Sequence, residues 1–313
     1  MKSIIYLSLV VFLIVLGCAK SDDFTVVNPN VNELKSAQND ISKDKQDRQI
    51  LYISKIDGAD DEIYAMNVDG SNVVQLTDND VPDGRATWSA NGQHIAFASG
   101  LAGSRDIFVM NANGKGLVNL TNSTADEDWP EWSPSGNTII FSSNCDGNYE
   151  IYIIDLDGTN LTRLTNRTQD DKWPSYSPDG SKIVFQSELG GTLRTEIFVM
   201  NADGSEITQL TERDGFDQMP TWSPDGTEIA FMRALSNPAG PEIFTMNVDG
   251  SNQINISNSA GMDARPSWSR NEDVISFISA RDGNQEVYTM NGDGSNPVRL
   301  TNNSVYDDYP SVK

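Results

Sequence analysis

The segment Asp128-Trp129-Pro130-Glu131-Trp132-Ser133-Pro134-Ser135-Gly136 decides how the chain is organised, because close copies of it recur along the sequence. The aromatic residue that precedes the turn recurs as Trp88, Tyr176, Trp222 and Trp268, at spacings of 44 or 46 residues. Such a period is typical of a repeat architecture in which each copy is one supersecondary unit. The 313 residues are therefore expected to form one repeat domain rather than two unrelated domains.

One full repeat, residues 132–165, predicts four short strands. The first strand ends at Trp132-Ser133, and a Pro-Ser-Gly turn leads into residues 138–142, which are rich in β-branched and aromatic side chains. Two further strands, residues 150–154 and 161–165, flank a hairpin at Asp157-Gly158. Four antiparallel strands in a period of this length are typical of a β-propeller blade.

The two ends of the chain complete the count of blades. The third strand and its hairpin occur six times, whereas the first-strand motif occurs only five times in full. Residues 49–54 supply a second strand, and residues 307–312 match the start of a first strand. We therefore predict an all-β fold, a six-bladed β-propeller with four antiparallel strands per blade, whose ring is closed by the N- and C-terminal strands in one blade.

The repeated units resemble a known family. Asp-x-x-Pro-x-Trp-Ser-Pro-Asp-Gly, Ile-x-Phe, Ile-Phe-x-Met-Asn-x-Asp-Gly-Ser and Leu-Thr are similar to the repeats of the TolB C-terminal propeller, also called PD40 or WD40-like repeats. The resemblance covers residues 49–313 and implies a six-bladed propeller. We expect no counterpart of the TolB N-terminal α/β domain, so the resemblance does not imply a role in the Tol-Pal system.

The first residues of the sequence predict export and a lipid anchor. Lys2 precedes a short apolar run, residues 4–16, which has the pattern of a secretory signal. Val15-Leu16-Gly17-Cys18 resembles the bacterial lipobox, in which the cysteine is lipidated. We predict an outer-membrane lipoprotein of the bacterial cell envelope, periplasmic or surface-exposed. Its parts would be a signal peptide (1–17), a lipid-anchored flexible tether that begins at Cys18 (18–48) and the TolB-like propeller (49–313).

The charge and the single histidine exclude some classes of function. Forty-five acidic against 22 basic residues give a formal net charge of −23, which repels a phosphate backbone, so no nucleic-acid partner is expected. His94 is the only histidine, and no Gly-x-Ser-x-Gly motif occurs, which disfavours histidine-ligated zinc and triad hydrolysis. The propeller is expected to be monomeric.

An acidic residue stands five positions before the aromatic position of every repeat. In a ring, these carboxylates would gather near one mouth of the central channel, where Ca²⁺ or Mg²⁺ would relieve their repulsion. The alternative is that each acid accepts backbone hydrogen bonds in its own turn or braces the neighbouring blade. The six predicted metal ligands are Asp83, Glu127, Asp171, Asp217, Asp263 and Asp307.

The second repeat is the most acidic, because Asp126, Asp128 and Glu131 surround Glu127. We predict that these three residues belong to the binding face. The first hypothesis is a non-catalytic, lipid-anchored propeller that presents its variable loop face and an acidic channel mouth to a protein, a peptide or a glycan. The alternative is a carbohydrate-active enzyme, a glycosidase or lyase, that uses mouth carboxylates such as Glu127 and Asp171.

Overall fold

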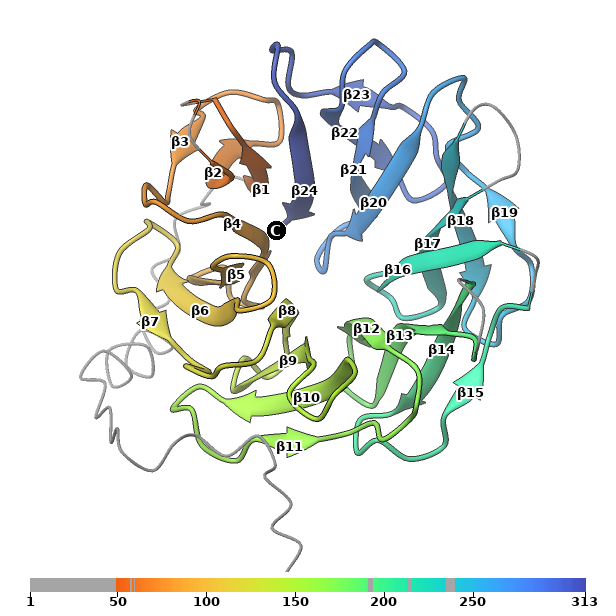
Figure 1. Ribbon diagram of the computed structural model, residues 1–313. Helices are drawn as coiled ribbons and strands as arrows, with labels where there is room; N and C mark the ends of the chain where they lie inside the picture. Colours follow the sequence, from red (N-terminus) through yellow and green to blue (C-terminus); the bar gives the residue numbers. More distant parts are fainter. Residues whose placement is uncertain (1–48, 57, 59, 191–193, 213–214, 235–239) are drawn as a thin grey trace, which may run out of the picture.

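A computed structural model describes residues 49–313 except 57, 59, 191–193, 213–214 and 235–239. Within these residues it contains 24 β-strands, arranged as sheets around a common axis, and no helix (Figure 1). No helix that could cross a membrane is therefore found in this part of the chain. The predicted signal peptide, the tether and Cys18 lie outside the described residues.

Four of the sheets have four strands each, and in three of them the strand nearest the axis comes first in the chain, whereas in the sheet that closes the ring it comes last. The sheet that closes the ring has the order β24 (Asp307–Val312), β1 (Gln49–Ser54), β2 (Glu62–Asn67) and β3 (Val74–Gln75). The next sheet contains β4 (Asp83–Trp88), β5 (His94–Ser99), β6 (Asp106–Asn111) and β7 (Val118–Asn119). The third contains β8 (Glu127–Trp132), β9 (Thr138–Ser143), β10 (Glu150–Asp155) and β11 (Thr162–Arg163). The fourth contains β20 (Asp263–Trp268), β21 (Val274–Ser279), β22 (Glu286–Asn291) and β23 (Val298–Arg299).

The remaining eight strands form one continuous sheet, which corrects the predicted blade count. They are β12 (Asp171–Tyr176), β13 (Lys182–Glu188), β14 (Thr195–Asn201), β15 (Thr208–Gln209), β16 (Phe216–Trp222), β17 (Glu228–Ala234), β18 (Pro241–Asn247) and β19 (Ile254–Asn255). The prediction of six separate four-stranded blades is wrong, because only four blades stand as separate four-stranded sheets. Thr195 of β14 and Phe216 of β16 form a parallel pair, which joins strands β12–β15 to strands β16–β19. Several strands here, β14 and β16 among them, are seven residues long instead of six, so these two reach each other.

The ring closes through the predicted pairing of the two ends of the described chain. β24 lies antiparallel to β1, with Ile50 opposite Val312 and Ser54 opposite Asp307. This pairing protects an edge of β1 that would otherwise present unpaired backbone groups.

The strands nearest the axis, β4, β8, β12, β16, β20 and β24, share a β-bulge. In β8 the pairing passes from Asp128–Ser142 to Glu131–Ile140, so Trp129 and the proline after it oppose a single residue of β9. Each bulge faces a buried aromatic residue of the neighbouring strand: Tyr52, Phe97, Phe141, Phe185, Phe231 or Phe277. Five of the six bulges end in proline, which has no N–H to leave unpaired.

The apolar core lies between neighbouring sheets. Trp132, for example, is 1% exposed and belongs to one cluster with Phe141 of its own sheet and with Ile107 and Val109 of the preceding sheet. Each sheet thus buries its faces against its neighbours, and burial of apolar surface is the main force that holds the ring together.

The hairpin glycines add close backbone contacts between repeats. At Gly250 (φ 83°) a Cβ atom would lie 2.3 Å from the carbonyl oxygen of Leu210 in the preceding repeat. The equivalent glycines Gly70, Gly114, Gly204 and Gly294 approach a carbonyl oxygen in the same way. Only a hydrogen atom fits between these backbones.

We predict that Gly250→Ala destabilises the protein more than Gly103→Ala. Both positions have positive φ, but nothing lies within 4 Å of a Cβ at Gly103. Gly103→Ala should therefore cost only the left-handed strain, about 1 kcal/mol, and Gly250→Ala at least about 1 kcal/mol more. The measurement is the free energy of unfolding in urea, and equal losses would contradict the packing role of this glycine.

Candidate functional site

The central channel is the candidate site, and two cavities follow one another along it. The first, which we call the chamber, has a volume of about 210 Å³ and is lined by turn residues that follow the strands nearest the axis. The second, of about 120 Å³, lies nearer the starts of these strands. The residues that line both cavities and form the waist of the channel are Thr87, Glu131, Thr221, Ser267 and Ser311.

Strand alternation explains the waist. Each waist residue directly precedes the side chain that packs into the core, such as Trp132 after Glu131, so it points the opposite way, toward the axis. Four of the five are serine or threonine, and Glu131 is the only carboxylate among them. Glu131 thus lines the channel, whereas the other two members of the predicted binding face line neither cavity.

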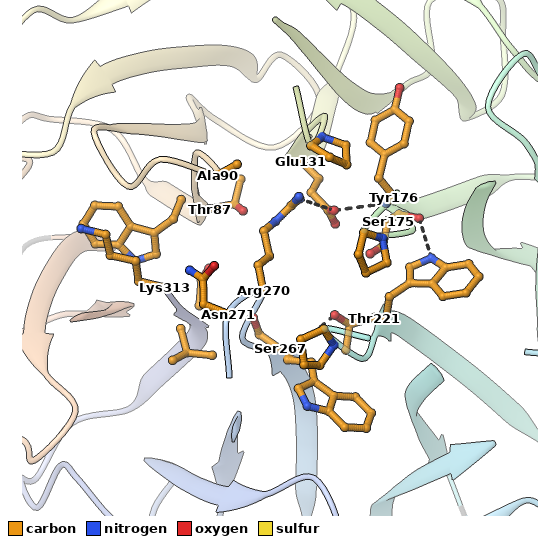
Figure 2. Close-up of a pocket in the computed structure, with 18 of the residues that line it drawn as sticks. Thr87, Ala90, Glu131, Ser175, Tyr176, Thr221, Ser267, Arg270, Asn271 and Lys313 are labelled. Carbon is orange, nitrogen blue, oxygen red and sulfur yellow. Dashed lines mark hydrogen bonds and ion pairs between the residues drawn. The ribbon is translucent and has the colours of Figure 1, made fainter. Parts of the chain in front are cut away.

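A charged bridge crosses the chamber (Figure 2). The Nη2 atom of Arg270 donates hydrogen bonds to Oε1 of Glu131 at 2.7 Å and to the carbonyl oxygen of Trp132 at 2.8 Å. Arg270 follows β20 and Glu131 belongs to β8, and these strands stand on opposite sides of the ring (Figure 1). We call this Arg270–Glu131 pair the crossbar. Burial raises the pKa of Glu131, although Arg270 opposes the rise.

Basic side chains outnumber acidic ones in the chamber, although the whole chain carries a charge of −23. Its charged lining residues are Arg270, Lys313 and Glu131. Lys313 places its Nζ atom 5.0 Å from the ring centroid of Trp88, and burial lowers the pKa of this lysine. The predicted acidic character of the channel is therefore not found in the lining of the chamber.

The second cavity is surrounded by six bulged residues in a left-handed backbone conformation, with φ between 46° and 56°. All six are half-buried, and bulky side chains rarely adopt this conformation. We call this ring the collar, and its members are Arg85, Trp129, Trp173, Met219, Arg265 and Tyr309.

Five collar residues contact one another in sequence around the mouth. The guanidinium of Arg265 lies 3.8 Å from the ring centroid of Tyr309, and that of Arg85 lies 4.7 Å from it. Arg85 is also 5.7 Å from the ring of Trp129, whose centroid is 4.3 Å from that of Trp173. Cation–π and aromatic contacts of this kind hold the side chains in a fixed order. Met219 instead packs against the neighbouring core cluster.

Acidic residues behind the collar are paired with arginines. Asp128 is buried and lies 2.9 Å from Arg85 and 2.6 Å from Arg105. Burial nevertheless raises the pKa of Asp128 to about 6. Burial would also raise the pKa of Asp126, but hydrogen bonds from Arg105 and Tyr149 hold it well below its usual range. Asp126 and Asp128 are therefore neutralised inside the protein and do not form an open acidic face.

The six predicted metal ligands are buried at the starts of the strands nearest the axis, and none of them lines the chamber or the second cavity. Each has a polar partner of its own. The partners are Asn79 for Asp83 (2.6 Å), Ser123 for Glu127 (2.8 Å), Arg167 for Asp171 (3.6 Å), Arg233 for Asp217 (2.6 Å), Arg281 for Asp263 (2.8 Å) and Asn303 for Asp307 (2.7 Å).

Backbone hydrogen bonds tie two of these positions to the preceding repeat, without use of the carboxylates. The N–H of Glu127 donates to the carbonyl oxygen of Arg105 at 2.9 Å, and that of Asp171 donates to Tyr149 at 2.8 Å, in both cases in the preceding repeat. Among the described residues, no group of three or more histidines, cysteines and acids could hold a metal ion. Calcium or magnesium binding stays a prediction.

Sequence reasoning missed two features of the site. The collar position was not recognised, although the residue two places after the acid that starts each unit is bulky in every copy. A second row of buried acids was also missed. Glu150 is fully buried and accepts a hydrogen bond from Oγ1 of Thr165 at 2.6 Å, and Glu286 does the same with Thr301. The available signal was the regular spacing of Glu-Ile or Glu-Val before four of the five Leu-Thr units.

The buried acid Glu127 predicts a pH dependence of stability. Burial raises its pKa to about 7, against an ordinary value of 4.5. Between these two values the folded protein holds a proton that the unfolded chain has released, so this contribution to stability is lost as the pH rises through 7. The free energy of unfolding should fall by about 2 kcal/mol more in the wild type than in Glu127→Gln between pH 5 and pH 7.

The difference between the wild type and Glu127→Gln isolates the contribution of Glu127 to the pH dependence of stability. Burial lowers the pKa of His94, which acts in the opposite direction, but His94 is present in both proteins. Glu206→Gln, in an exposed hairpin, is the matched control and should follow the wild type. Parallel curves for the wild type and Glu127→Gln in urea unfolding would contradict the raised pKa.

Comparisons with known proteins agree on the repeat. The sequence profile of PD40, the TolB beta propeller domain, matches residues 119–237 and 220–313. No match was found among curated proteins.

Solved structures share the fold at low identity. TolB from Acinetobacter baumannii is 20% identical with a TM-score of 0.72, over 85% of this chain and 66% of that chain. A protein assigned as TolB from Agrobacterium tumefaciens is 22% identical with a TM-score of 0.67, over 81% and 88%. An oligogalacturonate lyase in complex with manganese is 14% identical with a TM-score of 0.55, over 81% and 73%. At these identities the likeness concerns the fold alone.

Proposed function

Because the chain belongs to the TolB β-propeller domain family, we propose that it is a binding propeller of the bacterial cell envelope. The collar receives an extended segment of a partner, which is a protein, a peptide or a glycan chain. The chain covers 66% of the length of the Acinetobacter TolB.

The collar is the observation that carries this proposal. Six bulky side chains occupy a backbone conformation that costs of order 1–3 kcal/mol per residue when it is not supported by its surroundings. Strain of this kind collects at functional sites. Tryptophan, tyrosine and arginine also dominate the energetics of binding surfaces, and they fill five of the six positions.

The enzyme alternative lacks an equivalent observation. Glu127 and Asp171 were its candidate carboxylates, and both are at most 3% exposed and stand outside the two channel cavities. General acid or base catalysis requires hydrogen-bond reach to a substrate. The binding hypothesis therefore explains more of the geometry.

Substitution of the collar tests the proposal. The protein, isolated from its own membranes after reversible cross-linking, is expected to retain a partner that Trp129→Ala and Trp173→Ala each lose by about 30-fold, as for a binding hot spot. Val298→Ala, on the exposed outer strand β23, is the matched control and should retain the partner. Melting curves of all variants establish that they are folded. Retention of the same partner by both collar variants would rule the collar out.

We also propose that a lipid on Cys18 anchors the propeller in the outer membrane, facing the periplasm or the cell surface. Cys18→Ser should shift the protein from the membrane fraction to the soluble fraction, because a removed acyl anchor costs about 0.8 kcal/mol per buried CH₂. Cys145, the other cysteine of the sequence, is not free. If Cys18 formed a disulfide, its sulfur could not carry a thioether lipid. The mass of the Cys18 peptide, measured without reduction, therefore distinguishes a lipid from a disulfide on Cys18.

A further inference from the structure

We propose that the chamber binds a small sugar acid, a pyranose that carries one carboxylate, and that Arg270 holds the carboxylate. This site lies beyond the waist from the collar and does not depend on the partner proposed above. The chamber volume of about 210 Å³ is below the usual range of drug-sized pockets, so it suits a single small molecule.

The donors of Arg270 provide the anchor. Both of its hydrogen bonds to described residues use Nη2. A planar guanidinium binds a carboxylate through two parallel hydrogen bonds, from Nη2 together with either Nε or Nη1. A ligand carboxylate on Arg270 therefore takes the place of Glu131 as the acceptor. Arg270 is also a departure from the repeat, since proline occupies this position as Pro134, Pro178 and Pro224. Its presence is therefore not required by the turn itself.

The charged side chains of the chamber favour an anion. Arg270 and Lys313 oppose the single side-chain carboxylate, that of Glu131 (Figure 2). A dianion such as a phosphate monoester would be repelled by Glu131 more strongly than a monoanion. When a ligand carboxylate takes Arg270, Glu131 becomes an acceptor for a ligand hydroxyl.

The remaining lining fits the hydroxyl groups of a sugar. Thr87, Ser175, Thr221 and Ser267 surround the crossbar (Figure 2), and a hydroxyl both donates and accepts hydrogen bonds. Trp88 also lines the chamber and adds an aromatic side chain to its wall.

The test is calorimetric titration of the full-length protein in detergent with glucuronate, glucose and acetate. Glucuronate should bind, and glucose and acetate should bind at least about tenfold more weakly, because each lacks half of the recognised groups. Arg270→Gln should weaken glucuronate binding by at least about tenfold. Arg299→Gln, which removes an arginine paired with Glu286 on the outer strand, is the matched control and should leave binding unchanged.

Glu131→Gln separates a binding role of the crossbar from a structural one. Both Arg270→Gln and Glu131→Gln break the same bridge, so a purely structural crossbar predicts the same loss in both. The proposed site instead predicts that Glu131→Gln binds glucuronate at least as tightly as the wild type, because Arg270 is released and the glutamine still accepts a hydrogen bond.

Three results would overturn the proposal. They are no binding of glucuronate at millimolar concentration, equal binding of glucose or acetate, and equal loss in Arg270→Gln and Glu131→Gln. The collar partner should still be captured by Arg270→Gln, so a failure here is distinguishable from a failure of the proposed function.

Discussion

The left-handed residue in each strand nearest the axis is the constraint on which the channel depends. It starts a bulge in which two residues oppose one buried aromatic side chain, and the proline that usually follows leaves no unpaired N–H. The bulge places the residue before the proline on the collar. It also places the residue after the proline at the waist, and the residue after that is the aromatic one that packs in the core. One local conformation thus fixes three rings of side chains along the axis.

Charge is paired inside the protein rather than displayed at the mouth. The chain is strongly acidic, yet its buried acids accept hydrogen bonds from arginines, asparagines, hydroxyls and backbone N–H groups. A buried carboxylate is costly unless it is paired, so each pair favours one relative position of two segments. Asp217 shows this clearly, because Nε and Nη2 of Arg233 both donate to it at 2.6 Å. The charged side chains that remain in the channel lining are basic except for Glu131.

Much of the fold was predictable because each strand and hairpin is encoded within one period. The pairing of β24 with β1 followed from the fragments at the two ends of the repeat region. The joining of two units into an eight-stranded sheet did not, since it depends on one backbone pair, Thr195–Phe216, between residues outside the repeated motifs. The positions of the six predicted metal ligands at the starts of the strands nearest the axis were predictable. The direction of their side chains was not, because the bulge two residues later changes which side chains face the axis.

The asymmetric residues of the channel explain why the site was harder to predict than the fold. A residue that recurs in every repeat must satisfy the packing of every repeat, so it says little about a ligand. Glu131 is an acid where the other waist residues are serine or threonine, and it takes part in the crossbar. Its partner Arg270 lies in a copy of the turn that has lost its proline and glycine. Glu131 and Arg270 are 139 residues apart in the chain, and only the ring arrangement brings them within hydrogen-bond distance. In a propeller, paired departures across the axis are therefore a better guide to a site than any position that the repeats share.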